Sequence, residues 1–411
     1  MDRITCGIDW AEGHHDVAIS DSAGTVLARR RIDTGVIGFT ELEELFAAHS
    51  HEPGTVPVAI ETDKNLLVVA LQAAGHPVYP INPRAVARYR ERYGQAGGKS
   101  DPGDARVLAD ILRTDVHRHR VMPRMSANAL AIKALARQHQ EAIWAEHQTI
   151  SRLRSVLLEF YPQALQALQA FPNLKHKAAL AVLAAASTPT QGKQLSRRSL
   201  VTLLHRCGRR NDPALVERVL ADLKTPSLHQ PAAVETALGL TVNGLVHVIA
   251  AMQSTVHSLE AALATEFDQH PLAPVLRSAP GLGPVLAARV LAEVGDDPDR
   301  FATAQGLRAF AGTAPITRAS GRSRFVNARR VRNKRLADAC HWWAFSALTK
   351  STGARTHYDL RRAAGDTHNA ALRNLANKNL GRLWWCLIHE QLWDETHAWP
   401  SNNDLSQPAA A

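Results

Sequence analysis

The sequence predicts an α/β layer at the N-terminus, followed by a mostly helical remainder. Two observations lead to this prediction. Short strand-like runs alternate with helical patterns over residues 4–81, and two long stretches further on repeat apolar residues every three or four positions. The 411 residues, 45% of them apolar, are enough for roughly two to four domains.

The N-terminal layer should consist of strands and helices in alternation. Apolar and polar residues alternate in an initial meander, whose second and third strands are joined by a turn at Gly24. The last core element should close near Arg113, and we assign residues 1–123 to this domain. The expected strands are 4–9, 16–20, 25–32, 56–61 and 77–81, and the expected helices are 37–48 and 65–74.

Two long helices are expected in the middle of the chain. Ser126 is a good N-cap residue, and neither Pro nor Gly follows it until Pro162. The second helix has an apolar seam over three heptads, at Val242, Leu245, Ile249, Met252, Val256, Leu259 and Leu263. The two helices could pair with each other as an antiparallel hairpin or with copies in another subunit, and the sequence leaves both arrangements open.

The segment between these helices, from about residue 171 to residue 230, has shorter helical patterns broken by Pro and Gly. It carries a basic cluster but no recognisable chemistry; the cluster is Arg197, Arg198, His205, Arg206, Arg209 and Arg210. We assign residues 124–270 to a helical, coiled-coil assembly region, 271–399 to a small and mostly helical C-terminal domain, and 400–411 to a disordered tail.

Charge and cysteine content narrow the classes of function. The formal net charge of +10 and the pI of about 9.7 favour a polyanionic partner, above all nucleic acid. No apolar run approaches the roughly 20 residues that span a bilayer, and no leader segment precedes the first strand, so we expect a cytoplasmic protein without a membrane partner. The four cysteines never stand at CxxC spacing, which argues against a zinc knuckle or a disulfide framework.

Four carboxylates are candidates for a metal site. Asp9 and Glu61 end the first and fourth expected strands, where the active sites of α/β layers collect. Asp101 and Asp104 stand three apart at the opening of a helix and therefore share a face. Such a cluster is stable chiefly when divalent cations neutralise it, and hard carboxylate oxygens suit Mg²⁺ or Mn²⁺. Two ions roughly 3.5–4 Å apart would assist both oxygens of a phosphodiester displacement.

Each acid also has a purely structural explanation. Asp101 before Pro102 suits the start of any helix, Asp104 suits the helix dipole, and Glu61 suits a solvated strand end. Asp9 is harder to explain in this way, because it follows an otherwise apolar strand. The occurrence of all four acids in this order favours the metal site.

The acidic segments resemble a known family. GIDWAEGHHDVAI, VAIET and KSDPGDARVLAD look like the DEDD motifs of the RuvC-like, RNase H-fold domain in transposases of the insertion-sequence family one-ten. The match falls on Asp9, Glu61, Asp101 and Asp104, and the resemblance implies that these four coordinate Mg²⁺. Lys99 stands where the family carries a lysine, which implies a contact to the scissile phosphate; an exposed loop lysine is the alternative.

The C-terminal part has two candidate nucleic-acid-binding features. Gly281 and Gly283 lie in a turn that resembles a helix-hairpin-helix, where backbone N–H groups approach a phosphate; a simple tight turn is the alternative. Residues 301–337 hold nine Arg or Lys and no Asp or Glu, which indicates phosphate contact. The nine are Arg308, Arg318, Arg322, Arg324, Arg329, Arg330, Arg332, Lys334 and Arg335.

Ser320 lies inside this basic run, next to Gly321. A hydroxyl is a poor nucleophile until a base, a metal or guanidinium groups assist it, and alone Ser320 would suit a turn. However, PGLGPVLAARVLAEVGD and FATAQGLRAFAGTAPITRASGRSRF look like the C-terminal domain of the same family, whose nucleophilic serine stands in a Ser-Gly pair. By position that serine is Ser320. Arg322 and Ser323 follow where the family usually has a small residue, which leaves Ser323 as a rival.

The resemblance also implies an activity and partners. In this family the serine attacks a DNA phosphate to give a covalent intermediate, and a structured bridge RNA selects donor and target DNA. Homodimers assemble into a tetramer in which the RuvC-like domain of one subunit meets the serine domain of another. We therefore expect DNA, a guide RNA and further copies of the chain as partners, Mg²⁺ as cofactor with Mn²⁺ as a substitute, and a cytoplasmic location at the nucleoid.

Two other functions stay open on the residues alone. One is a RuvC-like nuclease of the junction-resolvase type that uses water, and the other is a non-catalytic nucleic-acid scaffold. His14 and His15 neighbour Asp9, but imidazole is a poor ligand for Mg²⁺, so we leave both out of the metal site. The tryptophans near the C-terminus are expected in the core rather than stacked on bases; these are Trp342, Trp343, Trp384, Trp385 and Trp393.

Overall fold

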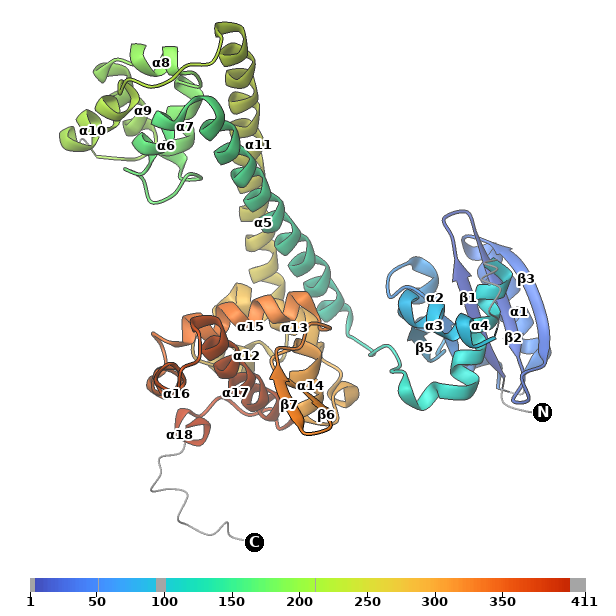
Figure 1. The fold of residues 1–411 in the computed structure, drawn as a ribbon. Helices are drawn as coiled ribbons and strands as arrows, with labels where there is room; N and C mark the ends of the chain where they lie inside the picture. Colours follow the sequence, from blue (N-terminus) through green and yellow to red (C-terminus); the bar gives the residue numbers. More distant parts are fainter. Residues whose placement is uncertain (1–3, 51, 94–100, 211, 400–411) are drawn as a thin grey trace. The chain divides into compact units, whose positions relative to one another are not determined.

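The computed structural model describes residues 4–50, 52–93, 101–210 and 212–399 (Figure 1). Lys99 and the predicted tail at 400–411 lie outside the described residues. By their contacts the residues form two compact units, Met1–Arg124 and Met125–Ala411. The division predicted between residues 270 and 271 falls inside the second unit and stays a prediction.

A five-stranded mixed sheet forms the centre of the first unit. β1, β2 and β3 pair antiparallel as the predicted meander, and β4 and β5 extend the sheet in parallel from β1, in the order β3-β2-β1-β4-β5. The predicted strands are confirmed to within two residues at each end. The strands are β1 (Thr5–Trp10), β2 (His14–Ser20), β3 (Val26–Asp33), β4 (Val58–Ile60) and β5 (Val78–Pro80).

Helices cover both faces of this sheet. The two predicted helices, α1 (Val36–His49) and α2 (Leu66–Ala73), pack with β1 and β2 into one core. On the other face, α4 (Asp101–Asp115) packs with α3 (Pro83–Tyr93). The sequence pattern did not indicate α3, because nearly half of its residues are charged and, among those whose burial is described, Val86 is the fully buried apolar one. Two short turns complete the unit, η1 (Pro53–Thr55) and η2 (Val116–Arg118).

Gly7 allows α4 to lie directly against β1. A Cβ atom at Gly7 would overlap the carbonyl oxygen of Ala105 and the amide nitrogen of Ala109, both on the backbone of α4. Two residues before Gly7 on β1, the Thr5 hydroxyl donates a hydrogen bond to the carbonyl oxygen of Ala109 on α4 at 3.1 Å. This close packing fixes the position of the helix start relative to the strand end.

Two long helices form an antiparallel hairpin in the second unit (Figure 1). α5 (Ala127–Phe160) begins at the predicted cap Ser126, whose hydroxyl oxygen accepts a hydrogen bond from the amide of Ala129. α11 (Ala232–Asp268) returns alongside it, so that Asn128 near the start of α5 donates to Glu266 near the end of α11. Of the two arrangements that the sequence left open, the chain therefore contains the hairpin within one subunit.

The apolar seam of α11 is only partly covered. Val242, Ile249 and Leu263 are buried, whereas Met252 and Val256 remain partly exposed. The best 18-residue window of α11 has a mean hydropathy of 1.4, so by length and composition alone this helix qualifies as a membrane span. That finding departs from the expectation that no such run exists. A helix that packs in the core of a protein needs the same apolar composition, and 33% of the window is buried in this way.

Each end of the hairpin carries its own core. Around the Phe160 end pack α6 (Pro162–Leu168), α7 (Lys177–Ala185), α8 (Pro189–Gln194), α9 (Arg197–Arg206) and α10 (Pro213–Leu223). At the other end, Ile132 and Phe267 join the C-terminal core. Its elements are α12 (Ala273–Ser278), α13 (Pro284–Val294), η3 (Pro298–Arg300), α14 (Ala304–Ala311), β6 (Ile316–Ser320), β7 (Ser323–Asn327), α15 (Lys334–Ala347), α16 (Thr352–Ala363), α17 (His368–Ile388) and α18 (Glu395–Ala398).

The C-terminal tryptophans divide between core and surface. Trp343 is fully buried, and Trp384 and Trp393 pack against the same core, as predicted. For Trp342 and Trp385 the prediction was wrong, because they lie on the outer faces of α15 and α17 and are 48% and 45% exposed. Helical spacing alone did not show which face of each helix would be covered.

Candidate active site

Strand register gathers acids on the face of the sheet that α4 covers. Gly7 contacts α4, and alternate residues of a strand share a face, so Asp9 lies on this face as well. Asp16 on β2 is the cross-strand partner of Asp9 and has the same orientation. Ala59 on β4 packs against α4, and Glu61, two residues further along, continues the same alternation. The ends of β1 and β4 thus carry neighbouring carboxylates.

The other two acids come from the first turn of α4. Asp101 is the first helical residue and is exposed, whereas Asp104 is 4% exposed. The guanidinium of Arg90, on α3, donates to Oδ1 of Asp104 through Nε at 2.8 Å and also through Nη2. Both bonds end on the same oxygen, so Oδ2 of Asp104 has no partner among the described residues. A second positive ligand could bind this carboxylate without displacing Arg90.

The electrostatics of Asp9 show that these carboxylates crowd one another. Burial and the negative charges of Asp104, Glu61, Asp101 and Asp16, in that order, raise the pKa of Asp9 from 3.8 to about 6. Like charges raise a carboxyl pKa only at short range, so the four predicted acids share one neighbourhood. Near neutral pH the neighbourhood therefore carries negative charge that a divalent cation would stabilise.

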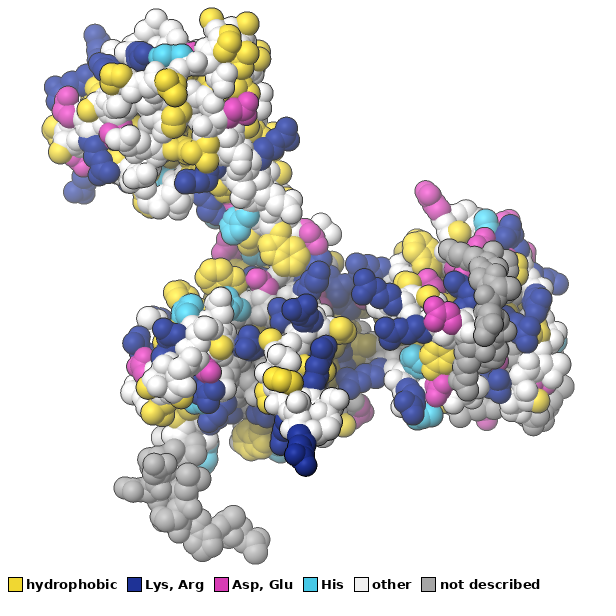
Figure 2. Space-filling view, viewed as in Figure 1, with side chains coloured by type: hydrophobic (Ala, Val, Ile, Leu, Met, Phe, Trp, Pro, Cys, Tyr) yellow, Lys and Arg dark blue, Asp and Glu magenta, His cyan; other side chains and the backbone are white. Residues whose placement is uncertain are grey.

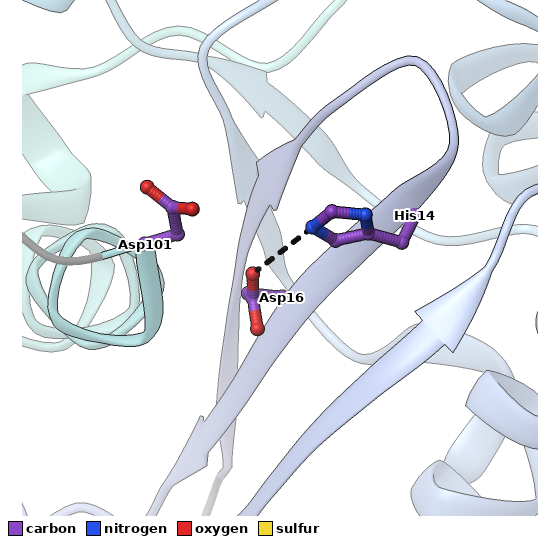
Figure 3. Close-up of side chains that lie close together, drawn as sticks. All are labelled: His14, Asp16 and Asp101. Atoms are coloured by element: carbon purple, nitrogen blue, oxygen red, sulfur yellow. Dashed lines mark ion pairs between the residues drawn. The ribbon is translucent and has the colours of Figure 1, made fainter.

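The predicted acids are nevertheless not gathered into one coordination sphere. Over the described part of the chain, the group of potential ligand atoms that lie within 4.8 Å of one another is His14, Asp16 and Asp101 (Figure 3). His14 Nε2 lies 3.9 Å from Asp16 Oδ2, and Asp101 approaches from the start of α4. Asp16 is already held by Arg31, which donates at 2.8 and 3.2 Å. This second group is therefore partly neutralised.

Sequence reasoning missed three of the residues that contact these acids. Arg31 and Arg90 lie outside the quoted motifs, and Asp16 lies inside the first motif but was not singled out. Strand register and helix packing bring all three to the site. The signal for Asp16 was available: a two-strand antiparallel register places it opposite Asp9. His14 was set aside on ligand chemistry, and the structure places it beside Asp16 and Asp101 all the same.

Ser320 lies at the tip of an exposed hairpin. It is the last residue of β6 and the direct partner of Ser323, the first residue of β7, across the turn at Gly321. Because directly paired residues share a face, both hydroxyls lie on the side that also carries Arg318 and Phe325. Register alone does not distinguish the two serines.

The surroundings of Ser320 are basic and uncovered. All ten residues of β6 and β7 are exposed except Ile316, which is partly buried. Figure 2 shows Lys and Arg side chains over this hairpin and its surroundings. Of the predicted contacts in this region, Arg329 is partly buried, and the others are exposed: Arg318, Arg322, Arg324 and Arg330.

The predicted glycine turn has a clear structural role. Gly281 has a φ of +84°, and a Cβ there would stand 2.6 Å from the amide nitrogen of Ala347 on α15. The indole N–H of Trp343 donates to the carbonyl oxygen of Pro280 at 2.9 Å, which holds the turn on the core. Gly283 precedes α13, is exposed and has open space at its Cβ position. Only Gly283 keeps a free approach to the start of that helix.

Two known protein families match this chain, one over its N-terminal part and one over its C-terminal part. The DEDD transposase family of IS110 matches residues 6–162, and the transposase family IS116/IS110/IS902 matches residues 273–359. A mini-circle transposase assigned to IS117, from Streptomyces coelicolor, is 46% identical over 398 residues, which are 96% of each chain. An IS110 insertion-element protein of the same organism is 31% identical over 389 residues, or 93% of each chain.

A mixed sheet with a carboxylate cluster and these matches define a transposase, an enzyme that acts on DNA. The chain belongs to the IS110 family of insertion-sequence transposases, which is the family one-ten that its motifs resemble.

Proposed function

We propose that this transposase cuts and rejoins DNA through a serine-linked intermediate, with divalent cations held by an RNase H-like, RuvC-like first unit. The observation that supports the proposal most directly is the crowding of Asp9 with Glu61, Asp101 and Asp104 on the α4 face. Family membership supplies the DNA substrate.

Mg²⁺ is the proposed cation, with Mn²⁺ as a substitute. The donor set fits such an ion, because it consists of carboxylate oxygens and because Oδ2 of Asp104 has no partner among the described residues. Asp9, Glu61, Asp101 and Asp104 would hold it. When bound, it would polarise the scissile phosphate and stabilise the charge on the leaving oxygen.

Ser320 is the proposed nucleophile. Its hydroxyl oxygen would bond to phosphorus while the phosphodiester P–O bond breaks, and the departing oxygen would take a proton; rejoining reverses these changes. The guanidinium groups of Arg318 and Arg322, beside Ser320 in the hairpin, would stabilise the charge that develops on the phosphate. The exposure of the hairpin leaves room for a polynucleotide.

The proposed partners are element-end DNA, target DNA and a structured guide RNA that selects both. Homodimers would assemble into a tetramer, so that each acid cluster meets a serine hairpin of another subunit. The protein would act in the cytoplasm, at the nucleoid. Its relative named for the IS117 mini-circle suggests that a circular form of the element is one of the DNA substrates.

A covalent-trapping experiment tests the nucleophile. Purified protein is incubated with end-labelled element DNA and Mg²⁺, and the label that stays with protein on a denaturing gel is measured. We expect an adduct with wild type and with Ser323→Ala, and none with Ser320→Ala. An adduct that persists in Ser320→Ala but disappears in Ser323→Ala would reassign the nucleophile.

The same reactions separate the two alternatives. A junction resolvase that uses water would form no adduct, and Ser320→Ala would cleave DNA as wild type does. A non-catalytic scaffold would neither form an adduct nor cleave, and Asp9→Asn would change nothing. Either result would end the proposal.

A further inference from the structure

Three cations, two partly buried and one exposed, lie together at the edge of the C-terminal core, and no ion pair joins any of them to another described residue. Arg308 comes from α14, and Lys378 and Arg382 come from α17. Over the described residues, none of the three has an ion pair, and Nε of Arg308 and Nη1 of Arg382 are buried without a hydrogen-bond partner. Buried guanidinium nitrogens normally have acceptors, so this cluster lacks a ligand that its chemistry calls for.

A glycine on α17 leaves the space that the Arg308 guanidinium occupies. Gly381 is buried in the middle of α17, and a Cβ there would overlap the guanidinium of Arg308. Glycine inside a helix is less favourable than alanine. α17 is therefore less stable with Gly381 than it would be with alanine, at the position where the Arg308 guanidinium packs. Gly381 lies between Lys378 and Arg382 in the sequence. Arg308 is fixed in place rather than free at the surface.

The neighbours of the cluster hold it in place but neutralise it only in part. Trp399 presents its ring to Arg382, whose Cζ lies 4.2 Å from the ring centroid, and to Lys378, whose Nζ lies 5.8 Å away. Glu395 is the carboxylate that acts on Arg382, but its oxygens accept hydrogen bonds from Ser351 and from the indole of Trp393. The cations thus gain aromatic contacts, and Glu395 offsets only part of the charge, because burial and Arg308 still leave the pKa of Arg382 lowered.

The charges of the cluster oppose one another. Burial lowers the pKa of Arg308; burial and then the charges of Arg382 and Arg308 lower the pKa of Lys378. The pKa of Arg382 is lowered first by burial and also by Arg308. Each shift means that the protonated form is less stable here than in water, so a bound anion would relieve a repulsion that the fold itself creates.

We propose that Arg308, Lys378 and Arg382 form a receptor for one phosphate group of the DNA backbone, in addition to the contacts around Ser320. Two guanidinium groups and an ammonium that converge from two helices match the several oxygens of a phosphate. The proposal rests on the family's action on DNA and does not depend on the serine or metal chemistry. Inorganic phosphate has the same chemistry, and the experiment separates the two ligands.

DNA binding by the full chain tests the receptor. The affinity for a labelled duplex is measured as a function of salt for wild type, Arg308→Met and a matched control, Arg355→Met. The control removes the same charge from an exposed arginine of the same core that is already paired with Asp359 at 2.8 Å. We expect Arg308→Met to reduce the salt slope by about one and the control to leave it unchanged.

A variant that changes no charge tests the same binding site for the Arg308 guanidinium in a second way. Gly381→Ala keeps every cation but fills the space in which the Arg308 guanidinium lies. We expect it to weaken DNA binding at least about threefold and to reduce the salt slope, as Arg308→Met does. The salt slope reports on the receptor and covalent trapping reports on the nucleophile, so failure of the receptor and failure of the proposed nucleophile give different results.

Thermal unfolding distinguishes a receptor from a structural arginine. If Arg308 awaits an anion, Arg308→Met should raise the unfolding temperature of the DNA-free protein, and inorganic phosphate should stabilise wild type more than this variant. A lower unfolding temperature together with an unchanged salt slope would overturn the proposal. Stabilisation by inorganic phosphate with an unchanged DNA slope would also overturn it and would assign the site to the free anion.

Discussion

Two candidate regions are built in opposite ways. The acid face of the first unit is the side of the sheet with Asp9 and Glu61, together with Asp101 and Asp104 at the start of α4, and the serine hairpin of the second unit is β6 and β7 with Ser320. Around Asp9, α4 lies so close to β1 that Gly7 has no room for a side chain, and Asp104 is almost fully buried. Around Ser320, β6 and β7 form a two-stranded sheet among the described residues, and nearly every side chain faces solvent. One candidate site is fixed by packing, and the other is not.

This difference indicates where binding energy is needed. An isolated two-stranded hairpin is marginally stable in water, so the position of Ser320 depends on what the hairpin contacts. The carboxylates are held in place by packing, and their mutual repulsion together with burial raises the pKa of Asp9 to about 6. Under the proposed function, a cation would relieve the repulsion among the acids, and contact with a polynucleotide would order the hairpin.

The largest effect is expected from loss of a carboxylate on the fixed face. Asp9→Asn should lower recombination between element ends and target at least about a thousandfold, because a ligand and its charge are lost together. Glu12→Gln is the matched control, since Glu12 is an exposed carboxylate in the turn after β1, and it should change the rate less than about threefold. Equal losses in the two variants would show that the acid face has no special role.

The next largest effect separates the two regions by stability. Gly7→Ala should lower the free energy of unfolding of the first unit by at least about 2 kcal/mol, because the methyl group would meet the backbone of α4. Gly321→Ala, at a φ of +55° with open space at Cβ, should cost about 1 kcal/mol. Denaturant unfolding measures both, and similar costs would contradict the comparison.

The sequence predicted which strand ends carry the acids of the first unit, but not the residues that contact those acids. Asp9 and Glu61 were identified because strand ends can be located from alternating apolar residues, and the element bounds held to within two residues. Asp16 and Arg90 were not, because their approach depends on strand register and on a charged helix that periodicity does not indicate. In the second unit, the basic run was visible, but the β6–β7 hairpin was not, since its short strands lack a buried face.

A smaller effect concerns pH. The pKa of Asp9 is raised in the folded state, so the folded chain binds its proton more tightly than the unfolded chain does. Stability of the cation-free protein should therefore fall as pH rises from about 4 through 6 and then level off. Asp9→Asn should lack this part of the dependence, with a thermal midpoint a few degrees above wild type at pH 7.5 and less difference at pH 4.5. A parallel pH dependence in both proteins would refute this assignment.

The smallest effect concerns the hairpin. Phe325 is 64% exposed on the Ser320 side of the hairpin, so Phe325→Ala should change the free energy of unfolding by less than about 0.5 kcal/mol. Phe46 is fully buried under the sheet, so Phe46→Ala should lower the free energy of unfolding by roughly 3–5 kcal/mol. If Phe325→Ala proved as costly as Phe46→Ala, the hairpin would be packed in solution and the contrast between the regions would fail.

Direct titration of the cation site tests the central claim. Binding of Mn²⁺ to the DNA-free protein, followed by electron paramagnetic resonance, should be lost or weakened at least about tenfold in Asp9→Asn and Glu61→Gln. His14→Ala should bind as wild type does. Unchanged binding in the first two variants, with loss in His14→Ala, would place the cation at the neighbouring His14 group and contradict the account.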